Sequence, residues 1–147
     1  MDKASIKKYD INLAAEFHVL SILRRLGYEA TLALGHKATI ALGNNKDVDI
    51  VVFKPDGRIA KIDVIGTADH RDWSINVKKL AHRKGLYIVL VCFSTKISDP
   101  NECPSVWVVP LRDLKKFLKE YRTKTVVSHS KILKKGEKYF QAWDTIA

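Results

Sequence analysis

Hydrophobic and polar residues alternate most regularly over residues 48–64, where two β-branched runs flank the segment KPDGR. In such a segment proline presets φ at the first turn position, aspartate suits the second, and glycine adopts the left-handed conformation that closes a three-residue loop. The pattern therefore predicts a β-hairpin in which Lys54 pairs with Arg58. Counting outward gives the other cross-strand partners: Phe53 with Ile59, Val51 with Lys61, and Asp49 with Asp63.

This register sorts the hairpin residues into two faces, because side chains alternate along a strand. One face is wholly apolar and is expected to pack on a helix: Val48, Ile50, Val52, Ala60, Ile62 and Val64. The other face carries Asp49 and Asp63, whose Cβ atoms would lie roughly 5 Å apart. Like charges so placed are destabilising unless they are balanced. A divalent metal ion is one candidate for that role, Lys61 on the same face is a second, and solvent at a wet end of the sheet is a third.

Further periodic segments lie on both sides of the hairpin. Leucine, isoleucine and phenylalanine recur at helical spacing over residues 10–26, with Leu13, Phe17 and Leu20 on the expected core face, and Gly27 is the expected C-terminal cap. Asp10 or Asn12 is the expected N-cap. The other predicted elements follow in chain order: a strand over 28–34, an ambiguous stretch over 66–84, a buried central strand over 86–93, a strand over 105–110, a helix over 111–121 and an aromatic C-terminal segment that docks on the core. The order predicts an α/β (α+β) fold with a mixed sheet flanked by helices.

Composition narrows the class of protein. The chain has 147 residues and is 46% hydrophobic, which suits one globular domain over residues 1–147. It contains no apolar run long enough to cross a bilayer and no apolar signal-peptide core, so we expect a cytoplasmic protein without a membrane partner. The two cysteines, Cys92 and Cys103, and the five histidines show no metal-ligand spacing. We therefore expect reduced structural thiols and scattered surface histidines.

The net charge of +10 favours a polyanionic partner, and DNA is the expected one. A basic surface without such a partner is the alternative. Trp73 is a candidate for stacking on a base or for a core anchor. The basic candidates for DNA contacts are spread along the chain: Lys37, Lys46, Lys78, Lys79, Arg83 and Lys84.

Three acidic residues lie in a recognisable order along the first half of the chain. Glu16 lies in the predicted early helix (INLAAEFHVLSILRRLGYEA), Asp49 follows a glycine-containing loop (GNNKDVDIVVF), and Asp63 lies in the partner strand (AKIDVIG). This arrangement resembles the PD-(D/E)XK nuclease superfamily and is similar to Holliday-junction resolvases and small intron-associated endonucleases. The resemblance covers about residues 10–66.

The resemblance implies a restriction endonuclease-like core and a metal-dependent endonuclease that hydrolyses phosphodiester bonds in DNA. Asp49 and Asp63 would bind Mg²⁺ or Mn²⁺, the Val64 carbonyl would complete the inner shell, and Glu16 would hold the metal or a metal-bound water. The metal would stabilise charge on the phosphate and lower the pKa of the attacking water. The likeness to resolvases also implies a homodimer, with Trp143 either in a dimer contact or in the docked C-terminal segment.

The lysine of the family motif is missing, because the position two residues after Asp63 is Ile65. An apolar side chain cannot replace an ammonium group that orients the water and offsets negative charge. Lys61, on the same strand face, is the candidate substitute. Three functions stay open: an endonuclease supported by a displaced lysine, a non-catalytic module that binds nucleic acid or protein on the same fold, and a basic α/β domain whose hairpin is only structural.

Overall fold

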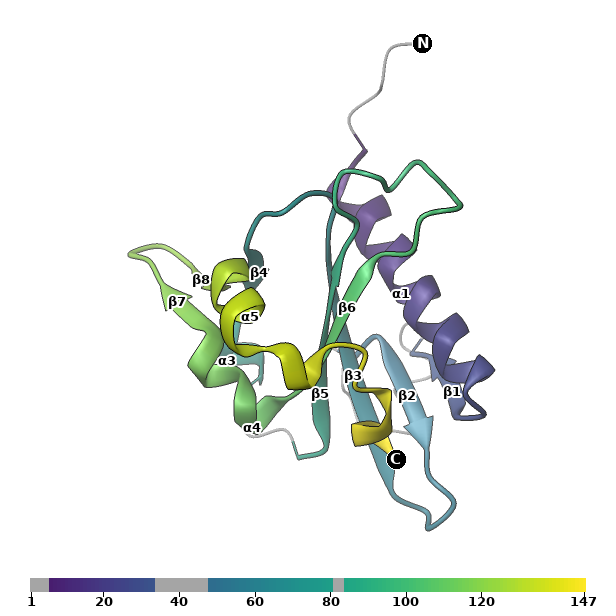
Figure 1. The fold of residues 1–147 in the computed structure, drawn as a ribbon. Coiled ribbons are helices and arrows are strands. Elements are labelled where there is room, and N and C mark those ends of the chain that lie inside the picture. The colour runs from purple at the N-terminus through teal and green to yellow at the C-terminus, as the bar shows by residue number, and fades with distance from the viewer. Residues whose placement is uncertain (1–5, 34–47, 81–83) are drawn as a thin grey trace.

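The computed structural model describes residues 6–33, 48–80 and 84–147 and shows two β-sheets and four α-helices in these residues (Figure 1). The larger sheet has five strands in the order β1-β2-β3-β5-β6, and the smaller has three in the order β4-β8-β7. Only β3 and β5 are parallel, so the larger sheet is mixed, as predicted. The strands are β1 (Glu29–Leu32), β2 (Ile50–Phe53), β3 (Ile59–Thr67), β4 (Trp73–Ile75), β5 (Leu86–Cys92), β6 (Ser105–Pro110), β7 (Leu118–Glu120) and β8 (Thr125–Val127).

The helices cover the larger sheet unevenly. The longest helix packs on one face of the sheet, and the smaller sheet lies with two short helices on the other face (Figure 1). No helix among the described residues has the length and apolar character needed to cross a membrane. The α-helices are α1 (Lys8–Arg25), α3 (Val77–Leu80), α4 (Leu111–Leu114) and α5 (His129–Lys135), and the 3₁₀ helices are η1 (Lys115–Phe117), η2 (Glu137–Tyr139) and η3 (Trp143–Ile146).

The predicted hairpin is confirmed. The Lys54 amide donates to the Arg58 carbonyl at 2.9 Å, and Gly57 has a φ of +84°. The Arg58 amide also donates to a carboxylate oxygen of Asp56 at 2.9 Å, which fixes the turn. Val51 lies opposite Lys61, as counted from the turn. The turn chemistry therefore sets the register of β2 and β3.

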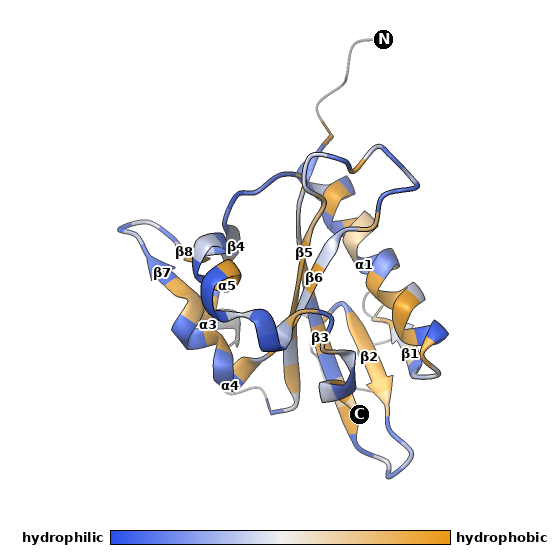
Figure 2. Ribbon diagram, in the orientation of Figure 1, coloured by the Kyte–Doolittle hydropathy of each residue, from blue (hydrophilic) through white to orange (hydrophobic). Residues whose placement is uncertain are grey.

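The apolar face of the hairpin packs against α1, also as predicted. We call this cluster the α1 core, and Figure 2 shows the apolar strand β2 within it. The expected face of the helix is right only in part: Leu20 packs against the core, whereas Phe17 is 52% exposed. The α1 core contains Ala15, Val19, Leu23, Ala30, Ile50, Val52, Ala60, Ile62, Val64, Val89, Val91, Val106, Val108, Trp143 and Ile146.

The close approach of α1 to β3 explains which helix face is buried. A Cβ added to Gly66 would lie 2.9 Å from the Ala15 Cβ and 3.2 Å from the Ile11 carbonyl oxygen. Only small side chains fit at this contact, so the face with Ala15 turns to the sheet and bulkier Phe17 turns away. The expected N-caps were also wrong, since Lys7 occupies that position without a side-chain cap. Gly27, with a φ of +87°, ends the helix as predicted.

The opposite face of the large sheet holds a second core, which joins it to the small sheet. The predicted helix over 111–121 stops early: α4 and η1 end at Phe117, and β7 follows. Phe117 is fully buried in this core, so packing against the sheet overrides helix propensity beyond it. The second core contains Trp73, Ile75, Leu86, Ile88, Leu90, Cys92, Trp107, Val109, Leu114, Phe117, Val127, Ile132 and Tyr139.

The aromatic C-terminal segment docks on the core, as predicted. The Gln141 amide donates to the Val106 carbonyl of edge strand β6 at 2.9 Å, and the Tyr28 hydroxyl donates to the Trp143 carbonyl at 3.0 Å. Trp143 is 7% exposed within the α1 core. Its ring is therefore committed to the docked segment and is inaccessible for a dimer contact.

Candidate functional site

An open edge of β3 forms the base of the candidate site. β3 has nine residues and β2 only four, so pairing with β2 stops at Ile62. Two backbone amides of β3 beyond this point donate to side chains: Val64 to Asp49 Oδ2 at 2.7 Å and Gly66 to Asn12 Oδ1 at 3.1 Å. A carboxylate and an amide thus replace the missing strand and satisfy the exposed edge.

Asp49 lies in a β-bulge at the end of β2. Its amide donates to the Ile62 carbonyl at 3.0 Å, whereas its carbonyl accepts from the Ala33 amide at 2.8 Å. Ile50 is also paired with Ile62, so two residues oppose one. The regular pairing that was expected to put Asp49 directly opposite Asp63 therefore ends one residue earlier. The bulge directs the Asp49 carboxylate along the open edge of β3.

Glu16 reaches the same edge from α1, one turn after Asn12. Its pKa is raised from the ordinary 4.5 to about 7, first by burial, then by the charge of Asp49 and by a hydrogen bond between the two side chains. Burial and a neighbouring negative charge both disfavour the ionised form of Glu16, so it keeps its proton to a higher pH than a free carboxyl. Glu16 and Asp49 therefore form a hydrogen-bonded acidic pair.

The pair opens into a cavity of about 250 Å³ that Asp63 and Val64 also line, and we call it the acidic cavity. Val64 packs in the α1 core, so Asp63, its neighbour in the strand, leaves the sheet on the other face. The Val64 carbonyl points to the same edge as its amide, and thus toward the cavity. The structure brings all four predicted metal-site residues to one cavity. It is lined by Lys8, Asn12, Glu16, Asp49, Asp63, Val64, Ile65, Ser74, Ile75 and Asn76.

The lysine at this cavity is Lys8, which the sequence reasoning missed. Lys8 is exposed in the first turn of α1 and lines the acidic cavity. Lys61 lies two residues before Asp63 on the same face of β3, but it does not line the cavity. Ile65 lines the cavity and packs against the second core. A helical lysine far from the motif carries no spacing signal, so only the fold could reveal it.

The expected DNA contacts of Trp73 are corrected by the structure. Trp73 is the first residue of β4, not part of a loop, and it is 1% exposed. Its indole nitrogen donates to the Val91 carbonyl at 3.1 Å. The ring is a core anchor and cannot stack on a base in this arrangement.

The basic candidates are dispersed where the structure describes them. Lys78 and Lys79 lie in the short helix α3, and the Lys78 side chain is exposed. Lys84 lines a separate hollow near the start of β5. Lys37, Lys46 and Arg83 lie outside the described residues.

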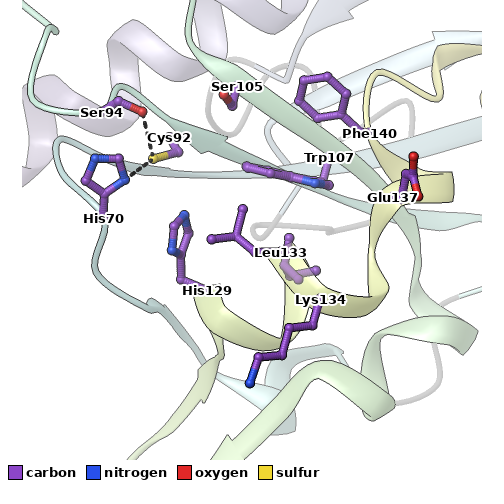
Figure 3. A pocket seen from close by; sticks show the side chains of 11 residues that line it. His70, Cys92, Ser94, Ser105, Trp107, His129, Leu133, Lys134, Glu137 and Phe140 are labelled. Carbon is purple, nitrogen blue, oxygen red and sulfur yellow. Dashed lines mark hydrogen bonds between the residues drawn. The ribbon is translucent and has the colours of Figure 1, made fainter.

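A second cluster of metal-binding side chains lies on the face of the large sheet that holds the second core (Figure 3). Among the described residues, His70, Cys92 and His129 form the one group of three such side chains whose ligand atoms all lie within 4.8 Å of one another. The carboxylates of the acidic cavity are spread more widely. The expectation of scattered surface histidines was therefore wrong, because the fold joins residues that are distant in the chain.

The two groups of side chains offer different donors. The metal-binding atoms that the acidic cavity offers are carboxylate, carbonyl and amide oxygens, which suit Mg²⁺ or Mn²⁺. Mg²⁺ usually keeps several waters and uses one or two carboxylates, so widely spaced carboxylates fit it. The other group, which we call the His–Cys–His cluster, presents nitrogen and sulfur.

Comparisons with known proteins found no relative of this chain. No protein-family model, no curated protein and no solved structure matches the chain. We therefore infer the function of the protein from the geometry of the described residues.

Proposed function

We propose that the protein is a Mg²⁺- or Mn²⁺-dependent endonuclease-like enzyme that hydrolyses phosphodiester bonds in DNA. The observation that carries this proposal is the meeting of Glu16, Asp49, Asp63 and the Val64 backbone in one cavity at the open edge of β3. These side chains come from a helix, a bulge and a strand, and their donors are all oxygen. The proposal includes the restriction endonuclease-like core that the sequence resembles.

Each residue has a role that follows from its position. Asp49 and Asp63 would hold the metal ion, and the Val64 carbonyl would face it from the strand. A bound Mg²⁺ would stabilise negative charge on the phosphate and make the attacking water more acidic. Glu16, with its pKa raised to about 7, can accept a proton near neutral pH.

Lys8 takes the part that the motif lysine would play. It is the lysine that lines the acidic cavity in the described part of the chain. A cation at this position would offset negative charge on the phosphate as the bond to water forms. We therefore assign this role to Lys8 in preference to Lys61.

A larger hollow of about 690 Å³ adjoins the acidic cavity and offers room for the DNA backbone. The two share Lys8, Ile65 and Ser74 in their lining. The exposed side chain of Arg71 also lines this hollow, although it is paired with Asp69 at 2.7 Å. The net charge of +10 favours association of the chain with DNA as a whole, and Lys8 and Arg71 are the basic residues that line this hollow.

A non-catalytic module that binds nucleic acid or protein is the second candidate, and one contact favours it. The Asp49 carboxylate accepts the Val64 amide at 2.7 Å, so it satisfies the strand edge whether or not a metal is bound. Ile65 stands where the family motif has lysine, and this also favours the non-catalytic module. The two candidates differ in whether the charge of Asp49 is needed.

Asp49→Asn separates the two candidates, because asparagine keeps an oxygen acceptor for Val64 and loses the charge. Wild-type protein and this variant are incubated with supercoiled, branched and single-stranded DNA in Mg²⁺ or Mn²⁺. We expect wild type to cleave at least one substrate and Asp49→Asn to be at least 100-fold slower. Cys103→Ser, at an exposed position outside the cavity, is the matched control.

DNA binding without any metal-dependent product would reject the enzyme and favour the binding module. In that case Ile65→Lys is the next variant. A gain of cleavage would show that the cavity lacked only an ammonium group at the motif position and that Lys8 does not replace it.

A further inference from the structure

The His–Cys–His cluster lies where three segments meet. His70 is in the loop after β3, Cys92 is the last residue of β5, and His129 is the first residue of α5. His70 Nδ1 lies 4.0 Å from Cys92 Sγ. In Figure 3 both imidazoles point toward the sulfur. The three side chains therefore converge, although they come from distant parts of the sequence.

The separation between His70 and Cys92 is close to that around a bound zinc ion, and the other ligand atoms lie within 4.8 Å. With Zn–S of about 2.3 Å and Zn–N of about 2.0 Å, a tetrahedral ion holds sulfur and nitrogen about 3.5 Å apart. The observed 4.0 Å between His70 and Cys92 exceeds this by a few tenths of an ångström. A small rotation of the His70 side chain would close the difference, because His70 is exposed.

The surroundings hold the cluster in place. The His129 amide donates to Asp72 Oδ1 at 2.8 Å, which ties the start of α5 to the loop that carries His70. The His129 ring lies against Trp73, with the ring centroids 5.3 Å apart. The Cys92 thiol is 1% exposed and donates to the Asp69 carbonyl at 3.1 Å. An anchored ligand set with an apolar wall is typical of protein metal sites.

We propose that His70, Cys92 and His129 bind one Zn²⁺ ion, with the fourth position of the tetrahedron facing the adjoining cavity. Two imidazoles and a thiolate are donors that zinc prefers over the hard cations of the acidic cavity. That adjoining cavity measures about 440 Å³ and is lined by the cluster together with Lys134 and Glu137. Three protein ligands and one open position are the pattern of zinc sites that exchange a water or a small ligand.

Zinc binding is measured on protein first stripped of metal with a chelator. The full chain carries Glu16→Gln and Asp49→Asn, so that the acidic cavity does not compete. We expect one Zn²⁺ per chain, and release of a proton from the Cys92 thiol, measured by calorimetry in buffers of different ionisation enthalpy. Co²⁺ in place of Zn²⁺ should give a thiolate charge-transfer band, and azide should shift the Co²⁺ spectrum if the fourth position is open.

Three variants decide the outcome. His70→Ala, at an exposed position that should not disturb folding, is expected to weaken Zn²⁺ binding at least 100-fold. Cys92→Ser should remove the charge-transfer band, and Cys103→Ser should keep it. Zinc binding unchanged in His70→Ala, or a Co²⁺ complex without a thiolate band, would overturn the site. A Co²⁺ spectrum insensitive to azide would overturn the open position.

Discussion

The acidic cavity lies at the open edge of β3, whereas the His–Cys–His cluster lies on the second-core face of the large sheet, and the two differ in donor chemistry and in the spacing of their donors. The cavity has carboxylate oxygens that satisfy a strand edge and hydrogen-bond to one another. The cluster has nitrogen and sulfur donors within 4.8 Å of one another. Hard cations select the first kind of donor set and zinc the second. The two proposed metal sites therefore have separate donor sets within one small fold.

The comparison also shows two ways in which a fold prepares a site. The acidic cavity is formed mainly by the backbone, because a bulge and a short strand leave the edge of β3 open. The cluster is formed by side chains, since three segments meet across the second core. A substitution in one site should therefore leave the other intact.

The largest expected effect distinguishes Lys8 from Lys61. Lys8→Ala should slow cleavage about 100-fold at saturating Mg²⁺, because the ammonium group no longer offsets charge on the phosphate. Lys61→Ala should slow it less than tenfold. Lys7→Ala, an exposed neighbour at the start of α1, is the control. Equal rates for Lys8→Ala and Lys7→Ala would remove Lys8 from the mechanism.

The next effect tests whether the contact between α1 and β3 supports the acidic cavity and not the His–Cys–His cluster. Gly66→Ala should destabilise the protein by about 1–3 kcal/mol, because the new Cβ would lie 2.9 Å from the Ala15 Cβ. It should also weaken Mn²⁺ binding, since α1 carries Asn12 and Glu16, and leave Zn²⁺ binding unchanged. Denaturant unfolding and calorimetry measure these effects.

A second substitution checks the cause of that loss. Ala15→Gly removes the Cβ that the new side chain would meet, so the double variant should recover part of the stability and of the Mn²⁺ affinity. Additive losses in the double variant would show that the contact with Ala15 is not responsible.

A smaller effect comes from the protonation of Glu16. A carboxyl whose pKa is raised from 4.5 to about 7 favours the folded state below pH 4.5, and that stability is lost as the pH rises to about 7. The unfolding free energy of wild type should therefore fall by about 1–2 kcal/mol more than that of Glu16→Gln over this range, after allowance for solvent screening. Parallel pH curves would contradict the acidic pair.

Local signals predicted the parts of the fold that depend on neighbours in the chain. The KPDGR turn fixed the register of β2 and β3, and Gly27 ended the first helix. The bulge at Asp49 could not be predicted, because it depends on β1 and β3 together. The exposure of Phe17 on α1 could not be predicted for a similar reason, since the orientation of the helix depends on Gly66 in another strand.

The candidate sites, like the fold, were predicted where a local sequence signal exists and missed where none does. Glu16, Asp49 and Asp63 were found through a short motif, and the structure brings them to one cavity. The cluster has no motif, because His70 and Cys92 are 22 residues apart and His129 lies in a helix that the sequence did not indicate. Trp73 was ambiguous because an indole serves equally well as an anchor or as a stacking surface.

Mn²⁺ binding to wild type, Asp49→Asn and Asp49→Ala tests most directly whether the acidic cavity is a metal site. Calorimetry gives the affinity and denaturant unfolding gives the stability of each protein. We expect both variants to lose at least tenfold in Mn²⁺ affinity, while only Asp49→Ala loses about 1–3 kcal/mol of stability through the unpaired Val64 amide. Unchanged Mn²⁺ affinity in Asp49→Asn would contradict the account and leave Asp49 as a purely structural residue.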